Sequence, residues 1–133
     1  MKVMDIEGIG SAYGKKLAKA GIRSVEGLLK NGASVKGRKE IAATSGVDES
    51  MVLEWVNRAD LYRIKGVGKQ YSDLLEKAGV DTVVELSKRV PGNLYAKMEE
   101  VNQAKNLVNG MPGAKKVEGW IAQAKKLPRV VTY

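Results

Sequence analysis

The chain has 133 residues, of which 44% are hydrophobic and 29% charged, a composition typical of one globular domain or two small ones. Its 23 Lys and Arg residues outnumber its 15 Asp and Glu residues, which gives a formal net charge of +8. Because there is no Cys and no His, the sequence excludes disulfides, thiol nucleophiles, Ser-His-Asp triads, Cys/His zinc sites and imidazole acid–base catalysis.

The first expected elements are two short helices joined by a glycine. Tyr13, Leu17 and Ala20 recur at helical spacing, and Gly21 follows them where a helix commonly ends. Ser24 is a natural N-cap for the next helix. We therefore predict a helix, a glycine stop and a second helix in this region.

Two more helices are expected before residue 62. One runs from Ser34 to Thr44 and ends at Gly46. Asp48 can cap the other. Its apolar stripe consists of Met51, Val52, Trp55, Val56, Ala59 and Tyr62.

The second half of the chain is also expected to be helical. Thr82 can cap a short helix, a longer helix runs from Asn93 to Asn109, and Gly110 and Pro112 stop it. A last helix covers Lys115 to Leu127. Its apolar face consists of Val117, Trp120, Ile121, Ala124 and Leu127. For residues 129–133 the pattern leaves extended, packed and frayed conformations open.

The chain contains an internal repeat. Residues 6–28 align without gaps on residues 64–86 at an offset of 58, and ten of the 23 positions are identical. Trp55-Val56 corresponds to Trp120-Ile121 at an offset of 65, so the second copy carries about seven extra residues. We expect an all-α protein of two duplicated units, residues 1–62 and residues 63–133, the second with an insertion and a C-terminal tail.

The basic residues gather in two segments. Residues 11–40 contain eight bases and two acids, and residues 104–133 contain six bases and one acid, whereas residues 41–103 contain eight bases and ten acids. Such separation favours basic faces for a polyanion, nucleic acid first, although solvated basic faces are also common on proteins that bind no polyanion.

The most specific motif is a pair of glycines around one apolar residue, followed by a helix. It occurs as Gly8-Ile9-Gly10 and as Gly66-Val67-Gly68. Glycines permit a tight turn, and the central residue can point inward. The amides that follow lie in the first turn of a helix, where they lack intrahelical acceptors and face the positive end of the helix dipole. This arrangement predicts a phosphate site.

A dinucleotide-binding loop is the main competing interpretation of these glycines. Gly8, Gly10 and Gly14 miss the G-x-G-x-x-G spacing by one residue, the second copy has Ser72 at the third position, and no strand precedes either motif. The dinucleotide interpretation is therefore disfavoured.

The two motifs resemble the helix-hairpin-helix motif of DNA ligases, repair polymerases and recombinase N-terminal domains, which bind DNA without sequence preference. The run Ala20 to Leu29 and its copy Ala78 to Leu86 resemble the segment that follows in those domains. The whole chain also resembles a small bacterial family of unassigned function with paired helix-hairpin-helix units, through residues 120–125 and Leu127-Pro128-Arg129. The resemblance implies two SAM-like helical units.

The resemblance also implies which residues contact a nucleic-acid backbone. DNA-binding members tend to carry a base just after the second glycine; the second copy has Lys69-Gln70 there, whereas the first has Ser11-Ala12 and its lysines a turn later. The second hairpin is therefore predicted to be the better phosphate binder. The expected nucleic-acid-binding residues are Gly8, Ile9, Gly10, Ser11, Lys15, Lys16, Gly66, Val67, Gly68, Lys69 and Gln70.

Catalysis is not expected. Acidic pairs such as Asp48-Glu49 and Glu99-Glu100 are adjacent in sequence, so they do not converge on one helix face as a metal pair would. We predict no enzyme, no cofactor and no metal. No apolar run approaches the roughly 18 residues that cross a bilayer, so a cytoplasmic protein without a membrane partner is expected.

Two functions remain open at this point. The first is non-sequence-specific binding of a DNA backbone, with RNA also possible as the polyanion. The second is a helical scaffold or adaptor whose basic faces meet an acidic protein, with the hairpins serving as structural turns. Tyr13, Tyr71, Trp55 and Trp120 are predicted to be core residues before they are base-stacking residues, because they lie in apolar helical stripes.

Overall fold

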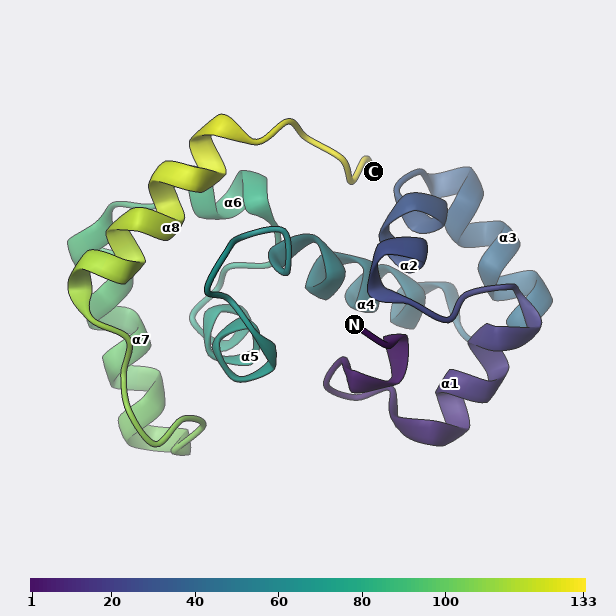
Figure 1. The fold of residues 1–133 in the computed structure, drawn as a ribbon, viewed down its shortest axis with the longest axis horizontal. Coiled ribbons are helices and arrows are strands. Elements are labelled where there is room, and N and C mark those ends of the chain that lie inside the picture. The colour runs from purple at the N-terminus through teal and green to yellow at the C-terminus, as the bar shows by residue number, and fades with distance from the viewer. The chain divides into compact units, whose positions relative to one another are not determined.

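The computed structural model describes all 133 residues and is entirely helical, with eight α-helices, one short 3-10 helix and no β-strand (Figure 1). The predicted all-α class is confirmed. None of the helices combines the length and the apolar character needed to cross a membrane. The chain forms two compact units: a first unit of Met1–Asp60 with Val130–Tyr133, and a second unit of Leu61–Arg129.

The first unit begins with the 3-10 helix η1, Val3–Asp5. Its α-helices are α1 (Gly10–Lys19), α2 (Val25–Gly32), α3 (Val35–Ser45) and α4 (Glu49–Leu61), the last of which ends one residue inside the second unit. The predicted N-cap at Ser24 is present, since its hydroxyl accepts a hydrogen bond from the Gly27 amide at 2.9 Å. The predicted stops are also present, because Gly21 and Gly46 both have φ of +77°.

The core of the first unit is built from the apolar stripes of its helices. Helix α3 packs against α1 and α2. The predicted stripe of α4 is buried at Val52, Trp55, Val56 and Ala59. Met51 and Tyr62 are only half-buried; α4 ends at Leu61, and Tyr62 lies in the turn that follows.

The second unit contains α5 (Lys69–Lys77), α6 (Val83–Ser87), α7 (Pro91–Lys105) and α8 (Ala114–Lys126). Helix α8 lies along α6 and α7 (Figure 1). Four residues of its predicted apolar face are buried in the core, Val117, Trp120, Ile121 and Ala124; the fifth, Leu127, follows the helix and is partly buried against that core.

The predicted bounds of α7, residues 93–109, were wrong at both ends. The helix starts at Pro91, because a proline in the first turn loses no hydrogen bond that the helix needs. It ends at Lys105, and the next residue, Asn106, is left-handed with φ of +50°. The side chain of Asn102 then bonds both the amide and the carbonyl of Val108, at 3.0 and 3.2 Å, which holds the following residues in a non-helical path.

The C-terminal residues pack on the first unit. Val131 is buried, and the Thr132 amide donates to the carbonyl of Ala33 at 2.8 Å. The buried guanidinium of Arg38 donates to the carbonyls of Gly32, Ala33 and Thr132 at 2.9, 3.0 and 2.6 Å. In the sequence Arg38 is one of the eight bases of residues 11–40, which were expected to form a basic face for a polyanion; in the structure it instead joins α2, α3 and the C-terminal segment.

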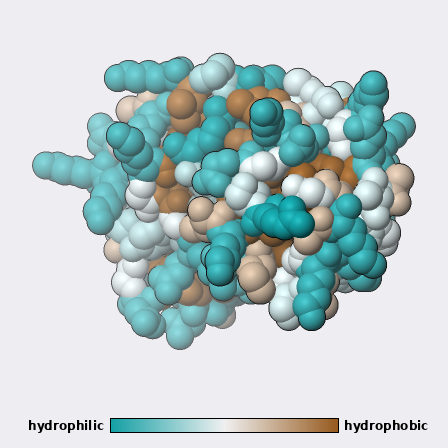
Figure 2. Space-filling model, turned by 45° about the vertical axis from the view of Figure 1, so that its right-hand side comes forward, coloured by the Kyte–Doolittle hydropathy of each residue, from teal (hydrophilic) through white to brown (hydrophobic).

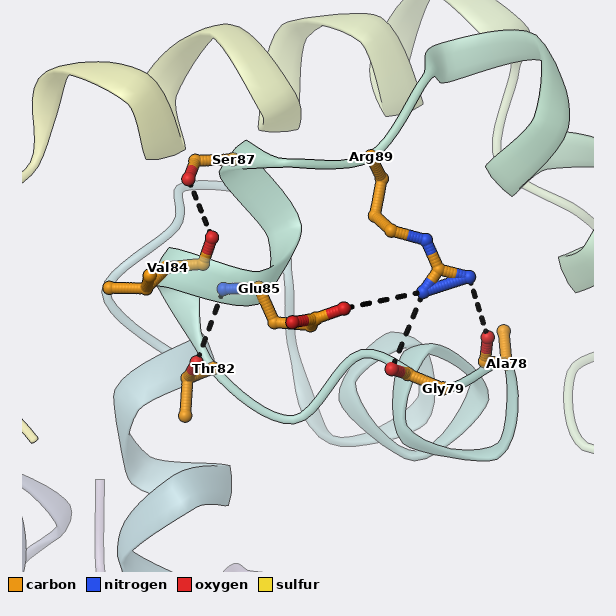
Figure 3. A network of polar contacts seen from close by, with 7 residues as sticks. All are labelled: Ala78, Gly79, Thr82, Val84, Glu85, Ser87 and Arg89. Atoms are coloured by element: carbon orange, nitrogen blue, oxygen red, sulfur yellow. Dashed lines mark hydrogen bonds and ion pairs between the residues drawn. The ribbon is translucent and has the colours of Figure 1, made fainter. Parts of the chain in front are cut away.

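A second arginine has a similar structural use inside the second unit (Figure 3). Arg89 donates to the carbonyl of Ala78 at 3.1 Å and to that of Gly79 at 3.4 Å, and lies 3.9 Å from a carboxylate oxygen of Glu85. These carbonyls end α5, where a positive charge is favourable. In the same view the Thr82 hydroxyl accepts from the Glu85 amide at 3.3 Å, the predicted N-cap of α6.

Candidate functional site

The two glycine turns have the same geometry at their first glycine. Gly8 and Gly66 have φ of +91° and +93°, a region that side-chain-bearing residues rarely adopt. The corresponding backbone bonds, amide to carbonyl, are Ile9 to Ile6 at 3.1 Å and Val67 to Ile64 at 3.2 Å. The shared sequence motif therefore produces the same backbone turn at the first glycine and the central residue of both copies.

The central residue of each turn points into its own unit. Ile9 and Val67 are 3% and 5% exposed. Their side chains therefore anchor the turns in the cores, and only their backbone atoms remain to contact a ligand.

A tyrosine–tryptophan pair supports each turn. The ring centroids of Tyr13 and Trp55 lie 5.1 Å apart, and those of Tyr71 and Trp120 lie 5.4 Å apart. Both tryptophans are 3% exposed, so their predicted core role is confirmed. Gly66 packs more tightly against its indole than Gly8 does. A Cβ placed on Gly66 would lie 3.0 Å from Nε1 of Trp120, whereas one on Gly8 would lie 3.8 Å from Nε1 of Trp55.

The helices that follow the turns start without a side-chain cap. Neither the residue before α1 nor the residue before α5 offers a side-chain hydrogen bond to the first-turn amides. The second glycines differ, since Gly10 has φ of +61° whereas Gly68 is extended, with φ of −103° and ψ of −165°. The first-turn amides of both helices are thus donors without an intrahelical acceptor.

The charge around the two helix starts is unequal. Helix α1 carries Lys15, Lys16 and Lys19 and no acidic residue, and Lys16 Nζ lies 5.5 Å from the centre of the Tyr13 ring. Helix α5 carries Lys69 and Lys77 but also Asp73 and Glu76. An anion therefore meets a net +3 along α1 and a net charge of zero along α5.

The structure places the predicted binding residues in two groups, one in each unit. Ser11, Lys15 and Lys16 are exposed on α1 beside the turn at Gly8–Gly10. Lys69 and Gln70 are exposed on the first turn of α5, beside the turn at Gly66–Gly68.

The prediction from the glycine motif missed two exposed basic residues near the first turn. Lys2 and Arg23 line the same cleft as Ser11 and Lys15. Lys2 precedes the repeat and Arg23 follows its first helix, so a search centred on the glycines misses both. Their proximity comes from tertiary contacts, which the sequence does not record. The Val3 amide donates to the Arg23 carbonyl at 3.0 Å, and a β-bridge pairs Lys2 with Ser24.

The sequence matches the family described as Domain of unknown function (DUF4332) over residues 7–127, and the chain belongs to this family. The matched range contains both glycine turns and both tryptophans that support them. No curated protein and no solved structure matches the chain. The expected resemblance to a family of unassigned function is supported by this match.

Proposed function

We propose that this protein binds the backbone of DNA without sequence preference, through two helix-hairpin-helix units that arose by duplication. The observation that carries the proposal is the repeated turn, in which an inward anchor and a left-handed glycine lead into an uncapped helix start. The ten identities in 23 aligned positions support the duplication.

The chemistry of each turn suits a phosphate. First-turn amides and the helix dipole together present a partial positive charge of roughly half an elementary charge. Exposed lysines lie near both helix starts, Lys15 and Lys16 in the second turn of α1 and Lys69 at the first residue of α5. None of these groups reads a base edge, so binding independent of sequence is expected.

A fluorescence anisotropy titration tests the proposal. Labelled duplex DNA, single-stranded DNA and duplex RNA are titrated with the protein at two salt concentrations. Each neutralised phosphate releases counterions, so the logarithm of the affinity should fall linearly with the logarithm of salt concentration. Absence of binding to every nucleic acid at about 50 mM salt, where phosphate contacts are strongest, would refute the proposal.

Variants separate the two hairpins. A Cβ at Gly68 meets no atom within 4 Å and its φ is −103°, so Gly68→Val combined with Lys69→Glu should fold while obstructing the second turn. Lys97→Glu, an exposed reversal on α7, is the control for charge. A second double variant, Ser11→Glu with Lys15→Glu, tests the first hairpin. If this variant loses DNA affinity while the Gly68/Lys69 variant keeps it, the first hairpin is the binding site. The net charge of +3 along α1 favours that outcome.

The alternative is a helical interaction module with no nucleic-acid role. The packing of both turns favours this alternative. Ile9, Val67 and the two tyrosine–tryptophan pairs hold the turns in place without a ligand, so the turns can serve as structural elements. Capture of partners from an extract treated with nuclease distinguishes the two functions. Protein partners that persist after nuclease, with no DNA binding in the anisotropy titration, would support the module.

A further inference from the structure

A cleft opens beside the first hairpin, within the first unit. It has a volume of about 450 Å³, within the roughly 300–1,000 Å³ usual for small-molecule sites. Its apolar lining comes from Val3, Met4, Gly14 and Ala18. Met4 is 41% exposed, whereas most large apolar side chains of the chain are buried.

One helix face and the 3-10 helix form this cleft together. Gly14 and Ala18 lie on one face of α1, four residues apart. A Cβ on Gly14 would lie 3.2 Å from Cβ of Met4, so the missing side chain lets η1 approach α1 closely. The cleft is therefore a built feature of the packing between these two elements.

The polar groups around the cleft are almost all cationic. Lys2, Lys15 and Arg23 line it, and no acidic residue does. No aromatic residue lines it either, which disfavours a stacked nucleobase. An apolar floor under three cations is complementary to an aliphatic group that carries an anion.

The corresponding positions of the second copy have the opposite charge. At the offset of 58, the residues aligned with Lys2, Lys15 and Arg23 are Asp60, Asp73 and Asp81. The register is the same, since the Ile6 amide bonds the Val3 carbonyl at 3.1 Å and the Ile64 amide bonds the Leu61 carbonyl at 3.1 Å. The two copies are thus alike in their turns and opposite in charge here.

The second copy also carries larger, polar side chains at two of the apolar positions. Met4 corresponds to Tyr62 and Gly14 to Ser72. Ser72 is fully buried, and its hydroxyl lies 3.4 Å from that of Tyr62. A hydrogen-bonded contact occupies the place where the first copy keeps an apolar, accessible surface.

We propose that the cleft of the first unit binds a small amphiphile, an aliphatic chain ending in one carboxylate or phosphate group. The chain lies on Met4, Gly14 and Ala18, and the anionic head lies among Lys2, Lys15 and Arg23. This site shares Ser11 and Lys15 with the first hairpin, but apolar contact with Met4, Gly14 and Ala18 adds to its binding energy and distinguishes it from a phosphate-binding turn.

Calorimetric titration with decanoate and with decyl phosphate, both below their micelle concentrations, tests the site, and the two arms show which head group is preferred. Decyltrimethylammonium, with the same chain and the opposite charge, is the ligand control. We expect saturable one-to-one binding of at least one anion and none of the cation. Equal binding of the cation would overturn the proposal.

Two variants test the location. Lys2→Asp with Arg23→Asp introduces the residues of the second copy and should weaken anion binding about tenfold, as expected for two exposed ion pairs replaced by repulsion. Lys36→Asp with Lys39→Asp makes the same charge change on exposed positions of α3 and should leave affinity within about twofold, because distant exposed charges are screened.

A volume test complements the charge test. Ala18→Leu fills the apolar floor and should reduce anion binding while leaving DNA affinity unchanged, which separates this site from the proposed hairpin function. Equal losses in the α3 control and the Lys2/Arg23 variant would overturn the proposal. Failure of both anions to bind would also overturn the proposal. If a peptide of alternating Glu and Leu bound at these residues when both anions had failed, the cleft would be assigned to a protein partner.

Discussion

The two glycines of the second turn offer a direct test of which of them the fold requires. Gly66 has φ of +93°, and a Cβ there would lie 3.0 Å from Nε1 of Trp120. Gly68 has φ of −103°, and a Cβ there would meet nothing within 4 Å. The change to alanine at each position therefore compares a strained site with an unstrained one, two residues apart.

The magnitudes follow from these two environments. Gly66→Ala forces a side chain into the left-handed region, which costs roughly 1–2 kcal/mol, and the crowded indole brings the expected total to about 2 kcal/mol. At Gly68 the reduced entropy of the unfolded chain favours alanine, whereas the helix N-cap favours glycine, so the net change should lie within about 0.5 kcal/mol of zero.

Urea denaturation followed by circular dichroism measures both variants. For a unit of this size, about 2 kcal/mol corresponds to a fall in melting temperature on the order of 10 °C, so a thermal scan provides a second measurement. Gly8→Ala is the matched control, because it shares the positive φ but leaves 3.8 Å to Nε1 of Trp55, and it should cost less than Gly66→Ala. Equal destabilisation by Gly66→Ala and Gly68→Ala would refute the reasoning.

Three further outcomes are expected. Arg38→Met should destabilise the protein by about 3 kcal/mol in urea denaturation, because three carbonyls lose a charged donor; a loss below about 1 kcal/mol would contradict the role assigned to this residue. Ser24→Ala and Thr82→Ala should each cost about 1 kcal/mol in the same assay, as lost N-caps, and an unchanged midpoint would mean that the caps contribute nothing. Lys15→Ala with Lys16→Ala should reduce the salt slope of DNA binding by about 2, and an unchanged slope would remove both lysines from the interface.

The surface does not point to a large apolar interface on the face shown in Figure 2. Hydrophilic side chains cover most of that face, and apolar atoms lie between them in small areas. The exposed large apolar side chains are scattered along the sequence, at Met1, Met4, Val35, Val90 and Tyr133. Only Met4 among them lines the amphiphile cleft, so that cleft is a local feature.

Local sequence was sufficient to predict the helical class and most helix ends. Helical spacing depends on residues three and four apart, and caps such as Ser24 and stops such as Gly46 act within one turn, so their signals are readable without a fold. The prediction was wrong for α7, where apolar spacing continues to Asn109. The bonds from the Asn102 side chain to Val108 and the left-handed Asn106 end the helix earlier, and spacing does not record either of them.

Tertiary structure decided which of the basic residues are available to a ligand. Arg38 and Arg89 looked equivalent to the exposed lysines in sequence, but their guanidinium groups donate to backbone carbonyls. The acceptors of Arg38 include carbonyls 6 and 94 residues away, and those of Arg89 are 10 and 11 residues away. The cleft beside the first hairpin was also invisible in the sequence, since Lys2 and Arg23 come to the same cleft only when the backbone at residues 2–3 pairs with that at residues 23–24. The repeat itself was evident from the sequence because ten of 23 aligned positions are identical. That Lys2, Lys15 and Arg23 of the first copy line one cleft was decided only by the packing of the first unit.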